Sequence, residues 1–287
     1  MTAWFLDPRG RVRGGWKALA FLLLYLGLGS LVALAARFSG IEQGLGPWSA
    51  ALIAAAASLA CVRLEGRSFL GLGLLPRPRW LLECLAGMLA GLLLILAMAL
   101  AVRALDGVHW TRTQGVGARQ ALAGAWVYAG VAFHEELATR GYPFQRLVEG
   151  AGPWVAQLAF AGLFAYAHWD NPGMAGTTRV WATLNIGLAA ILLGFCYLRT
   201  GSLALPIGVH LGWNWAQGSL LGFGVSGTSE GRGLWEPVFH GRPEWLTGGA
   251  FGLEAGLPCT VVCSLAILAL WRWRGTLSGG ASTASAS

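Results

Sequence analysis

The chain has 287 residues, of which 55% are hydrophobic and only 11% are charged. Soluble domains carry about a quarter charged residues, so this composition excludes an ordinary soluble protein. The formal charge of +7 comes from basic residues scattered through short polar connections, so nucleic acid is not an expected partner. We therefore expect an all-α, polytopic membrane protein with one membrane-embedded domain, residues 18–274.

The cysteines do not point to a disulfide framework or to structural zinc. An odd number of them stand singly in or near apolar runs, without a CxxC pair, at Cys61, Cys84, Cys196, Cys259 and Cys263. Free cysteines in such positions behave as small hydrophobic residues. We expect them to pack in the core.

The apolar runs predict about eight transmembrane helices, because crossing the hydrocarbon core takes roughly 20 apolar residues. In chain order they cover about 18–36, 47–62, 80–102, 120–149, 153–168, 180–198, 205–221 and 252–273. Prolines in the connector 63–79 exclude a continuous helix there. The first run is longer than the usual signal-peptide core of about 7 to 15 residues, so we expect an uncleaved span.

Basic residues are unequally divided between the alternate connections of this topology. Thirteen Lys and Arg fall on the side of the N-terminus and seven on the other side. The positive-inside rule then predicts that both termini are cytoplasmic, with residues 1–17 as a basic cytoplasmic segment. The tail 275–287 is small and polar, so we expect it to be disordered.

The segment 132–146, AFHEELATRGYPFQR, places charged residues at the end of an apolar run. Ionised groups in a low-dielectric setting are costly unless paired. Glu136 and Arg140 stand four apart on one helical face and can form an ion pair. Glu135 points about 100° away, so it can face a cavity as a general base. The zinc-protease pattern HExxH is excluded, because Ala138 stands where its second histidine is required.

Two further polar pairs interrupt the later apolar runs: Phe164 with His168, and His210 with Asn214. Residues four apart share a helical face, so His210 and Asn214 can together donate hydrogen bonds to an oxyanion. Phe164 is expected to pack below His168. Glu135 with an imidazole can activate water for attack on a peptide carbonyl. Alternatively, Glu135, His168 and His210 form a ligand set like that of a catalytic zinc site.

In these patterns the chain resembles the CPBP family of intramembrane endopeptidases, which includes type II CAAX prenyl proteases and bacteriocin-processing and immunity proteins. The resemblance is carried by EExxxR at 135–140, FxxxH at 164–168 and HxxxN at 210–214. The flanking RGYPFQRL and YLRTGSLALPIGVHLGWNWAQG also look like bacterial members of the family. It covers about residues 118–221. One departure is Thr139, where members commonly have an aromatic residue.

The resemblance implies a glutamate-type mechanism rather than a metal-dependent one, with no cofactor or with a divalent metal such as zinc. It implies that Glu135 acts on water with His168, and that His210 and Asn214 form the oxyanion site. Glu136, Arg140 and Phe164 would orient these groups. The substrate would be a membrane-associated peptide or protein, met among the lipids of a bacterial cytoplasmic membrane.

Two other interpretations use the same buried polar groups. A proton-coupled transporter could use the acids and histidines as a relay, although no strong internal repeat of the kind found in such transporters is present. A catalytically silent membrane scaffold or immunity protein could retain the fold. The sequence does not indicate the oligomeric state or whether a substrate is prenylated.

Overall fold

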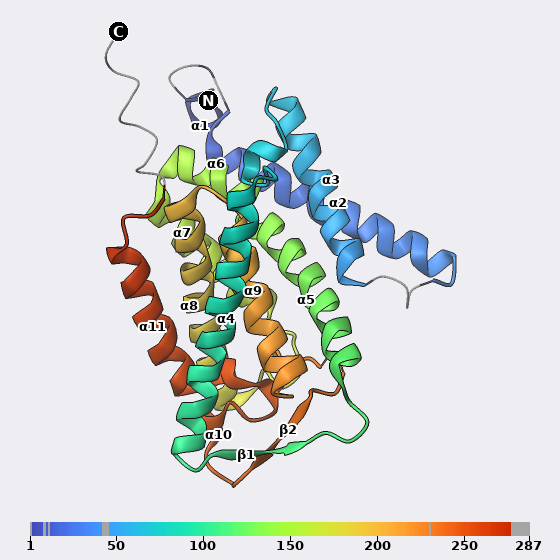
Figure 1. The fold of residues 1–287 in the computed structure, drawn as a ribbon. Coiled ribbons are helices and arrows are strands. Elements are labelled where there is room, and N and C mark those ends of the chain that lie inside the picture. Colours follow the sequence, from blue (N-terminus) through green and yellow to red (C-terminus); the bar gives the residue numbers. More distant parts are fainter. Residues whose placement is uncertain (1, 8–9, 11, 42–45, 230, 277–287) are drawn as a thin grey trace.

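The computed structural model describes residues 2–7, 10, 12–41, 46–229 and 231–276. The chain forms a bundle of helices with one small sheet at its end (Figure 1), which confirms the all-α class. Within the described residues, four helices are long and apolar enough to cross a membrane: α2 (Gly14–Phe38), α3 (Pro47–Leu64), α4 (Pro78–Ala104) and α8 (Gly176–Thr200). The count of eight spans stays a prediction.

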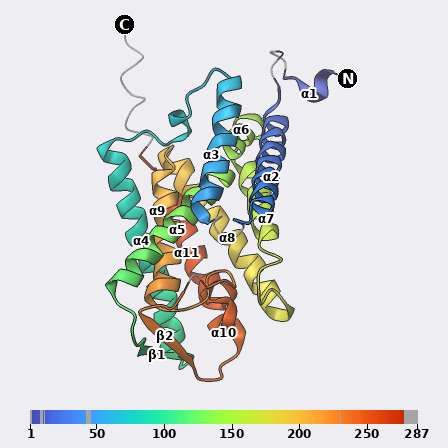
Figure 2. The ribbon, with the colours of Figure 1, turned by 90° about the vertical axis from the view of Figure 1, so that its right-hand side faces the viewer.

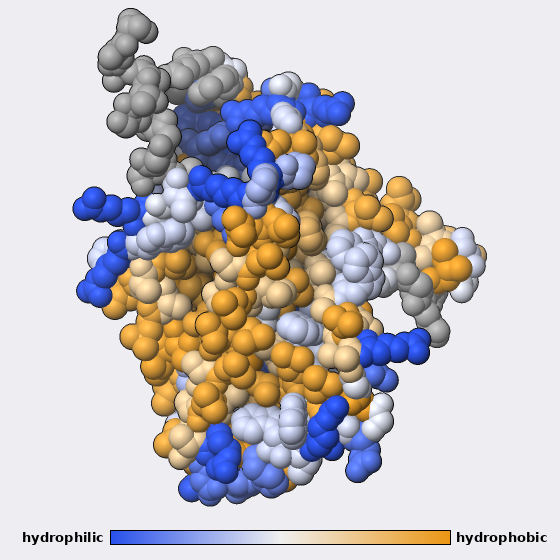
Figure 3. Space-filling model, viewed as in Figure 1, coloured by the Kyte–Doolittle hydropathy of each residue, from blue (hydrophilic) through white to orange (hydrophobic). Residues whose placement is uncertain are grey.

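The other helices among the described residues do not combine that length with that apolar composition. They are α1 (Thr2–Phe5), α5 (Ala118–Thr139), α6 (Tyr142–Ala151), α7 (Pro153–Ala167), α9 (Ala204–Asn214), α10 (Glu244–Thr247) and α11 (Leu257–Arg272). Single-turn segments lie at Leu70–Leu72, Gly249–Phe251 and Leu253–Ala255. An apolar surface separates two polar ends of the molecule (Figure 3), as expected of an integral membrane protein. The predicted disordered tail, 275–287, lies largely outside the described residues.

The predicted continuous helix 120–149 is wrong, because the chain breaks between α5 and α6. Pro143, in the first turn of α6, has no backbone N–H and cannot continue a preceding helix. Gly141 approaches the carbonyl oxygen of Leu137 so closely that a Cβ there would collide with it. The break turns α6 away from α5 at the end of the bundle where α1 lies (Figure 1).

Two other predicted helices have different bounds. The seventh, expected over 205–221, is α9 followed by a π-helical segment, Trp215–Leu220. The eighth, expected from 252, begins only at Leu257, with Pro258 in its first turn. Gly252, with a φ of 106°, ends the preceding helical turn in a conformation that L-residues rarely adopt.

A two-stranded antiparallel sheet, not predicted from the sequence, closes the end of the bundle opposite α1 (Figure 1). Strand β1 (Val108–Arg112) pairs with β2 (Trp235–Phe239), with Val108 opposite Phe239. The Trp110 indole N–H donates to the carbonyl oxygen of Leu221, 3.2 Å away. The sheet thereby fastens the connection after α4 to the end of the π-helical segment.

The closest helix contact in the bundle is between α4 and α9. Gly87 and Gly91 on α4 face Gly208 and Gly212 on α9, and a Cβ at any of the four would collide with the backbone of the other helix. Small residues spaced four apart allow this approach of two helices. Residues His210 and Asn214 are offset by two positions from the α9 glycines, about 200° around the helix. The glycine contact therefore turns both polar side chains away from α4, and His210 meets Glu136 of α5.

Helices α2 and α3 lie at the outside of the bundle, beside α5 and α6 (Figures 1 and 2). The N-terminal end of α2 touches α6, where Gly14 packs directly against Gly150. Lys17 forms an ion pair with Glu65 at 2.8 Å. Beyond these contacts α2 is loosely covered: only four of its 25 residues are buried.

Candidate active site

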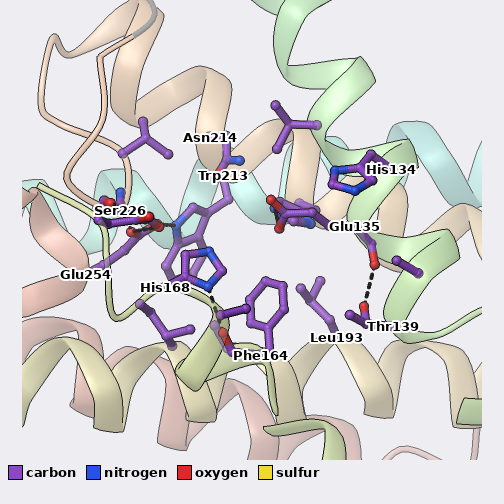
Figure 4. Close-up of a pocket in the computed structure, with 18 of the residues that line it drawn as sticks. His134, Glu135, Thr139, Phe164, His168, Leu193, Trp213, Asn214, Ser226 and Glu254 are labelled. Carbon is purple, nitrogen blue, oxygen red and sulfur yellow. Dashed lines mark hydrogen bonds and ion pairs between the residues drawn. The ribbon is translucent and has the colours of Figure 1, made fainter. Parts of the chain in front are cut away.

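A cavity of about 530 Å³ lies among α2, α5, α7, α8 and α9 (Figure 4). Most of its lining is apolar, including Leu22 and Leu26 of α2 and Leu163 of α7. The four residues predicted to carry the chemistry all line this cavity: Glu135, His168, His210 and Asn214. The fold thus brings together side chains from three helices that are far apart in the sequence.

Glu136 and Arg140 form an ion pair behind the cavity. The Arg140 guanidinium lies 3.1 Å from Glu136 Oε1, and both side chains are buried, with 1% and 0% exposure. Arg140 also donates to the carbonyl oxygen of Ala190 at 2.9 Å. Because a buried charge is tolerated only with such partners, this pair is a fixed point between α5 and α8.

The His210 ring lies between the two adjacent glutamates. Its Nδ1 is 2.9 Å from Glu136 Oε1, and its Nε2 is 3.6 Å from Glu135 Oε2. A carboxylate oxygen accepts hydrogen bonds, so Nδ1 carries a proton and donates it to Glu136. Glu136 therefore fixes the ring with Nε2 facing Glu135.

Phe164 and His168, the second sequence pattern, lie next to the Glu136–Arg140 ion pair. The Arg140 guanidinium carbon lies 5.0 Å from the centre of the Phe164 ring, a distance typical of a cation–π contact. The rings of Phe164 and His168 are 4.6 Å apart. His168 Nδ1 lies 2.7 Å from the Phe164 carbonyl oxygen, which can only accept a hydrogen bond. The neutral His168 ring therefore has its lone pair on Nε2.

The described residues do not fit the alternative of a metal centre. Among residues 2–7, 10, 12–41, 46–229 and 231–276, no group of three or more His, Cys, Asp or Glu side chains has the spacing needed to hold a metal ion. As placed, Glu135, His168 and His210 are not a ligand set.

Two further polar groups of the cavity were not predicted from the sequence. Tyr25 of α2 places its hydroxyl 2.5 Å from Nε2 of His134, the neighbour of Glu135. Glu254 lines the cavity on its other side, beside Ser226 (Figure 4). The available signal for Glu254 was an acidic residue within the apolar run assigned to the eighth helix, while Tyr25 gave none.

The fold and the cavity define an integral membrane protein with a buried polar centre that contains a carboxylate, two imidazoles and an amide. Residues 117–216 match the model of the family described as type II CAAX prenyl endopeptidase Rce1-like. The match confirms the predicted CPBP resemblance, contains all three patterns and ends before Glu254. Comparisons with curated proteins and with solved structures gave no match.

Proposed function

We propose that this protein is an intramembrane endopeptidase that hydrolyses peptide bonds in membrane-associated substrates. The observation that supports this proposal best is the shared cavity of Glu135, His168, His210 and Asn214, with an apolar lining around them. Such a cavity can hold an apolar peptide segment beside polar groups that act on it. The family described as type II CAAX prenyl endopeptidase Rce1-like supports the same class of reaction.

Glu135 is the proposed general base. It is the more exposed of the two glutamates, with 22% of its side chain exposed against 0% for Glu136. A water between Glu135 and His168 loses a proton to the Glu135 carboxylate, and its oxygen attacks the peptide carbonyl carbon. His168 Nε2 orients this water through its lone pair. When the C–N bond breaks, the proton on Glu135 passes to the leaving amine.

His210 and Asn214 are the proposed oxyanion donors. The Asn214 amide supplies one N–H, and His210 supplies a second through Nε2 when the ring carries protons on both nitrogens. The flanking carboxylates, 2.9 Å from Nδ1 and 3.6 Å from Nε2, stabilise that positive ring. Donors fixed before the reaction stabilise the developing negative oxygen without a reorganisation cost. The Glu136–Arg140 pair orients His210 and does not react.

The charge asymmetry of the connections supports an orientation with both termini in the cytoplasm. The segments RGYPFQRL and YLRTGSLALPIGVHLGWNWAQG, which look like bacterial members of the family, support a bacterial cytoplasmic membrane. The apolar cavity lining from α2 and α7 supports a substrate that is itself associated with the membrane. Peptide and lipid are therefore the proposed partners.

The test is a comparison of wild type with Glu135→Gln after reconstitution in vesicles. We expect wild type to cleave substrates that Glu135→Gln binds without cleaving, so the variant captures membrane proteins that proteomics then identifies. Cleavage should persist in the presence of a chelator. Proton or solute flux through wild-type vesicles without cleavage of any captured protein would instead support a transporter.

A further inference from the structure

Thr139, the last residue of α5, lines the cavity one helical turn after Glu135 (Figure 4). Its hydroxyl oxygen lies 2.5 Å from the Glu135 carbonyl oxygen and 2.7 Å from Nη1 of Arg140. A carbonyl oxygen can only accept a hydrogen bond, and a guanidinium can only donate one. The hydroxyl therefore donates its proton to Glu135 and accepts a hydrogen bond from Arg140.

The Arg140 guanidinium has two further acceptors. Nη1 also lies 3.1 Å from Glu136 Oε1, and Nη2 donates to the Ala190 carbonyl oxygen at 2.9 Å. Of the three acceptors, Thr139 is the one that lines the cavity. Arg140 itself is 1% exposed, so bulk water cannot replace an acceptor that is removed, and a buried donor left without its partner is costly. Loss of the Thr139 hydroxyl should therefore make the guanidinium turn.

The contacts continue from Arg140 to His210 through a single oxygen atom. Glu136 Oε1 accepts from Arg140 and also from His210 Nδ1, which is 2.9 Å away. The other oxygen, Glu136 Oε2, is buried and has no hydrogen-bond partner among the described residues. Glu136 is therefore held through Oε1 alone. A movement of the guanidinium moves the atom that orients the His210 ring.

We propose that Thr139 is a positioning residue that holds His210 in place through Arg140 and Glu136. The contacts start at the Glu135 backbone and end at the ring that faces the Glu135 carboxylate, so both proposed reacting groups are tied to one frame. This inference rests on the proposed peptidase function and adds a residue to the same site. Members of the family that the chain resembles commonly have an aromatic residue at this position, so this threonine hydroxyl is a feature of this chain.

The experiment separates the Thr139 hydroxyl from its methyl group. Thr139→Val keeps the shape and removes the hydroxyl, whereas Thr139→Ser keeps the hydroxyl, and Thr139→Ala differs from Thr139→Ser by the hydroxyl alone. Each full chain cleaves, in vesicles, an apolar peptide taken from a protein captured with Glu135→Gln. We expect kcat to fall on the order of tenfold in the Val and Ala variants, as for one hydrogen bond to a charged group, with KM unchanged. Thr139→Ser should restore most of kcat.

A second measurement does not depend on cleavage. NMR of the full chain in vesicles, labelled at the histidine nitrogens, reports the hydrogen bonding of each ring, and His210→Gln assigns the His210 signal. We expect Thr139→Val and Thr139→Ala to shift the His210 signal and Thr139→Ser to leave it in place. His109 and His240, at the sheet end of the bundle, are internal references whose signals should not move.

The matched control is Thr200→Val on α8. The Thr200 hydroxyl also donates to the carbonyl oxygen four residues earlier, that of Cys196, at 2.8 Å. It accepts from the Ser202 backbone N–H at 3.2 Å instead of from an arginine, and it lies outside the cavity lining. This variant should change neither kcat nor the His210 signal.

An unchanged kcat, or an unchanged His210 signal, in the hydroxyl-free variants would overturn the proposal. A raised KM at an unchanged kcat would assign Thr139 to substrate binding and would also overturn it. If Thr139→Val and Thr139→Ala did not fold while Thr139→Ser did, the hydroxyl would hold the fold and not His210 specifically, which again contradicts the proposal. A shifted His210 signal without any cleavage by wild type would refute the peptidase function alone.

Discussion

Helices α9 and α2 both line the cavity, but they are held in opposite ways. Nine of the eleven residues of α9 are buried, against four of 25 in α2. Helix α9 is fixed along its length by the glycine contact with α4 and by the bond from His210 to Glu136. Helix α2 is attached mainly at its N-terminal end, by Gly14 and Lys17.

The cavity needs both fixed positions for the groups that act on a peptide bond and an apolar wall for the peptide, and different helices supply the two. Groups that act on a peptide bond need positions fixed to a fraction of an ångström, and α9 with α5 provides such a frame. The α2 wall contributes Leu22, Tyr25 and Leu26, whose apolar contacts do not require a single geometry. We therefore expect changes in the α4–α9–α5 frame to cost more stability and activity than changes in α2.

The largest expected effect is that of breaking the buried ion pair. Arg140→Met leaves Glu136 buried without its cation, and breaking such a pair costs about 3–5 kcal/mol. Lys17→Met in α2 should cost about 1 kcal/mol or less, because the Lys17–Glu65 pair is partly exposed, 23% and 14%. Thermal unfolding in detergent, followed with a thiol-reactive dye on the five cysteines, measures both. Equal losses would contradict the comparison.

The glycine contact gives the next largest effect. Gly208→Ala brings a Cβ into the backbone carbonyl of Cys84, so we expect a loss of about 1–3 kcal/mol and reduced cleavage as His210 moves. Gly27→Ala is the matched control on α2. It meets no atom within 4 Å and should gain up to about 1 kcal/mol from helix propensity. The same dye assay measures the stability of both variants, and their cleavage rates are measured in parallel. If Gly208→Ala lost neither stability nor activity, the rigid frame would be refuted.

Tyr25→Phe tests the contact between α2 and the frame. The change removes the hydroxyl that bonds to His134 and keeps the apolar wall. We expect about 1 kcal/mol lower stability and a kcat/KM within about tenfold of wild type. Peptide cleavage measured in vesicles decides this. A loss as complete as in Glu135→Gln would mean that Tyr25 takes part in the reaction.

The smallest effect concerns pH at the sheet end of the bundle. A hydrogen bond from His240 to Asp106, 2.7 Å long, lowers the pKa of Asp106, and the nearby Arg242 and Arg103 lower it further. The contribution to stability is therefore present above the unfolded pKa of about 3.9 and is lost as pH falls through the lower folded value.

Hydrogen exchange of β1 and β2 between pH 3 and pH 6 reports this loss, and Asp106→Asn should remove the part of the pH dependence that Asp106 contributes. If protection of β1 and β2 against exchange fell equally with pH in wild type and in Asp106→Asn, Asp106 would not contribute.

The sequence predicted what short-range periodicity encodes. Apolar runs located the helices, and the four-residue spacings identified Glu136 with Arg140 and Phe164 with His168. Periodicity alone did not predict which distant segments pair. Val108 in β1 pairs with Phe239 in β2, far along the chain. The sequence of either strand alone predicts a loop. The bond from Trp213 to Glu254 likewise depends on where a turn places an acid.

The break between α5 and α6 was missed for a different reason. Apolar and helix-favouring residues continue from 120 to 149, so periodicity supported one helix, and the local signals Gly141 and Pro143 were outweighed. The convergence of the three patterns could be expected from the family resemblance. The position of His210 between Glu135 and Glu136 required the helix packing that the structure supplies.

The most direct test of the central claim is the rate of peptide cleavage by Glu135→Gln compared with Glu136→Gln, each purified and shown to remain folded. Glu135 faces the cavity as the proposed base, whereas Glu136 positions His210. We expect Glu135→Gln to bind peptide but to cleave it no faster than background. Wild type, and Glu136→Gln as far as it remains active, should show a bell-shaped dependence of the cleavage rate on pH. Cleavage by Glu135→Gln at a rate near wild type would contradict the account.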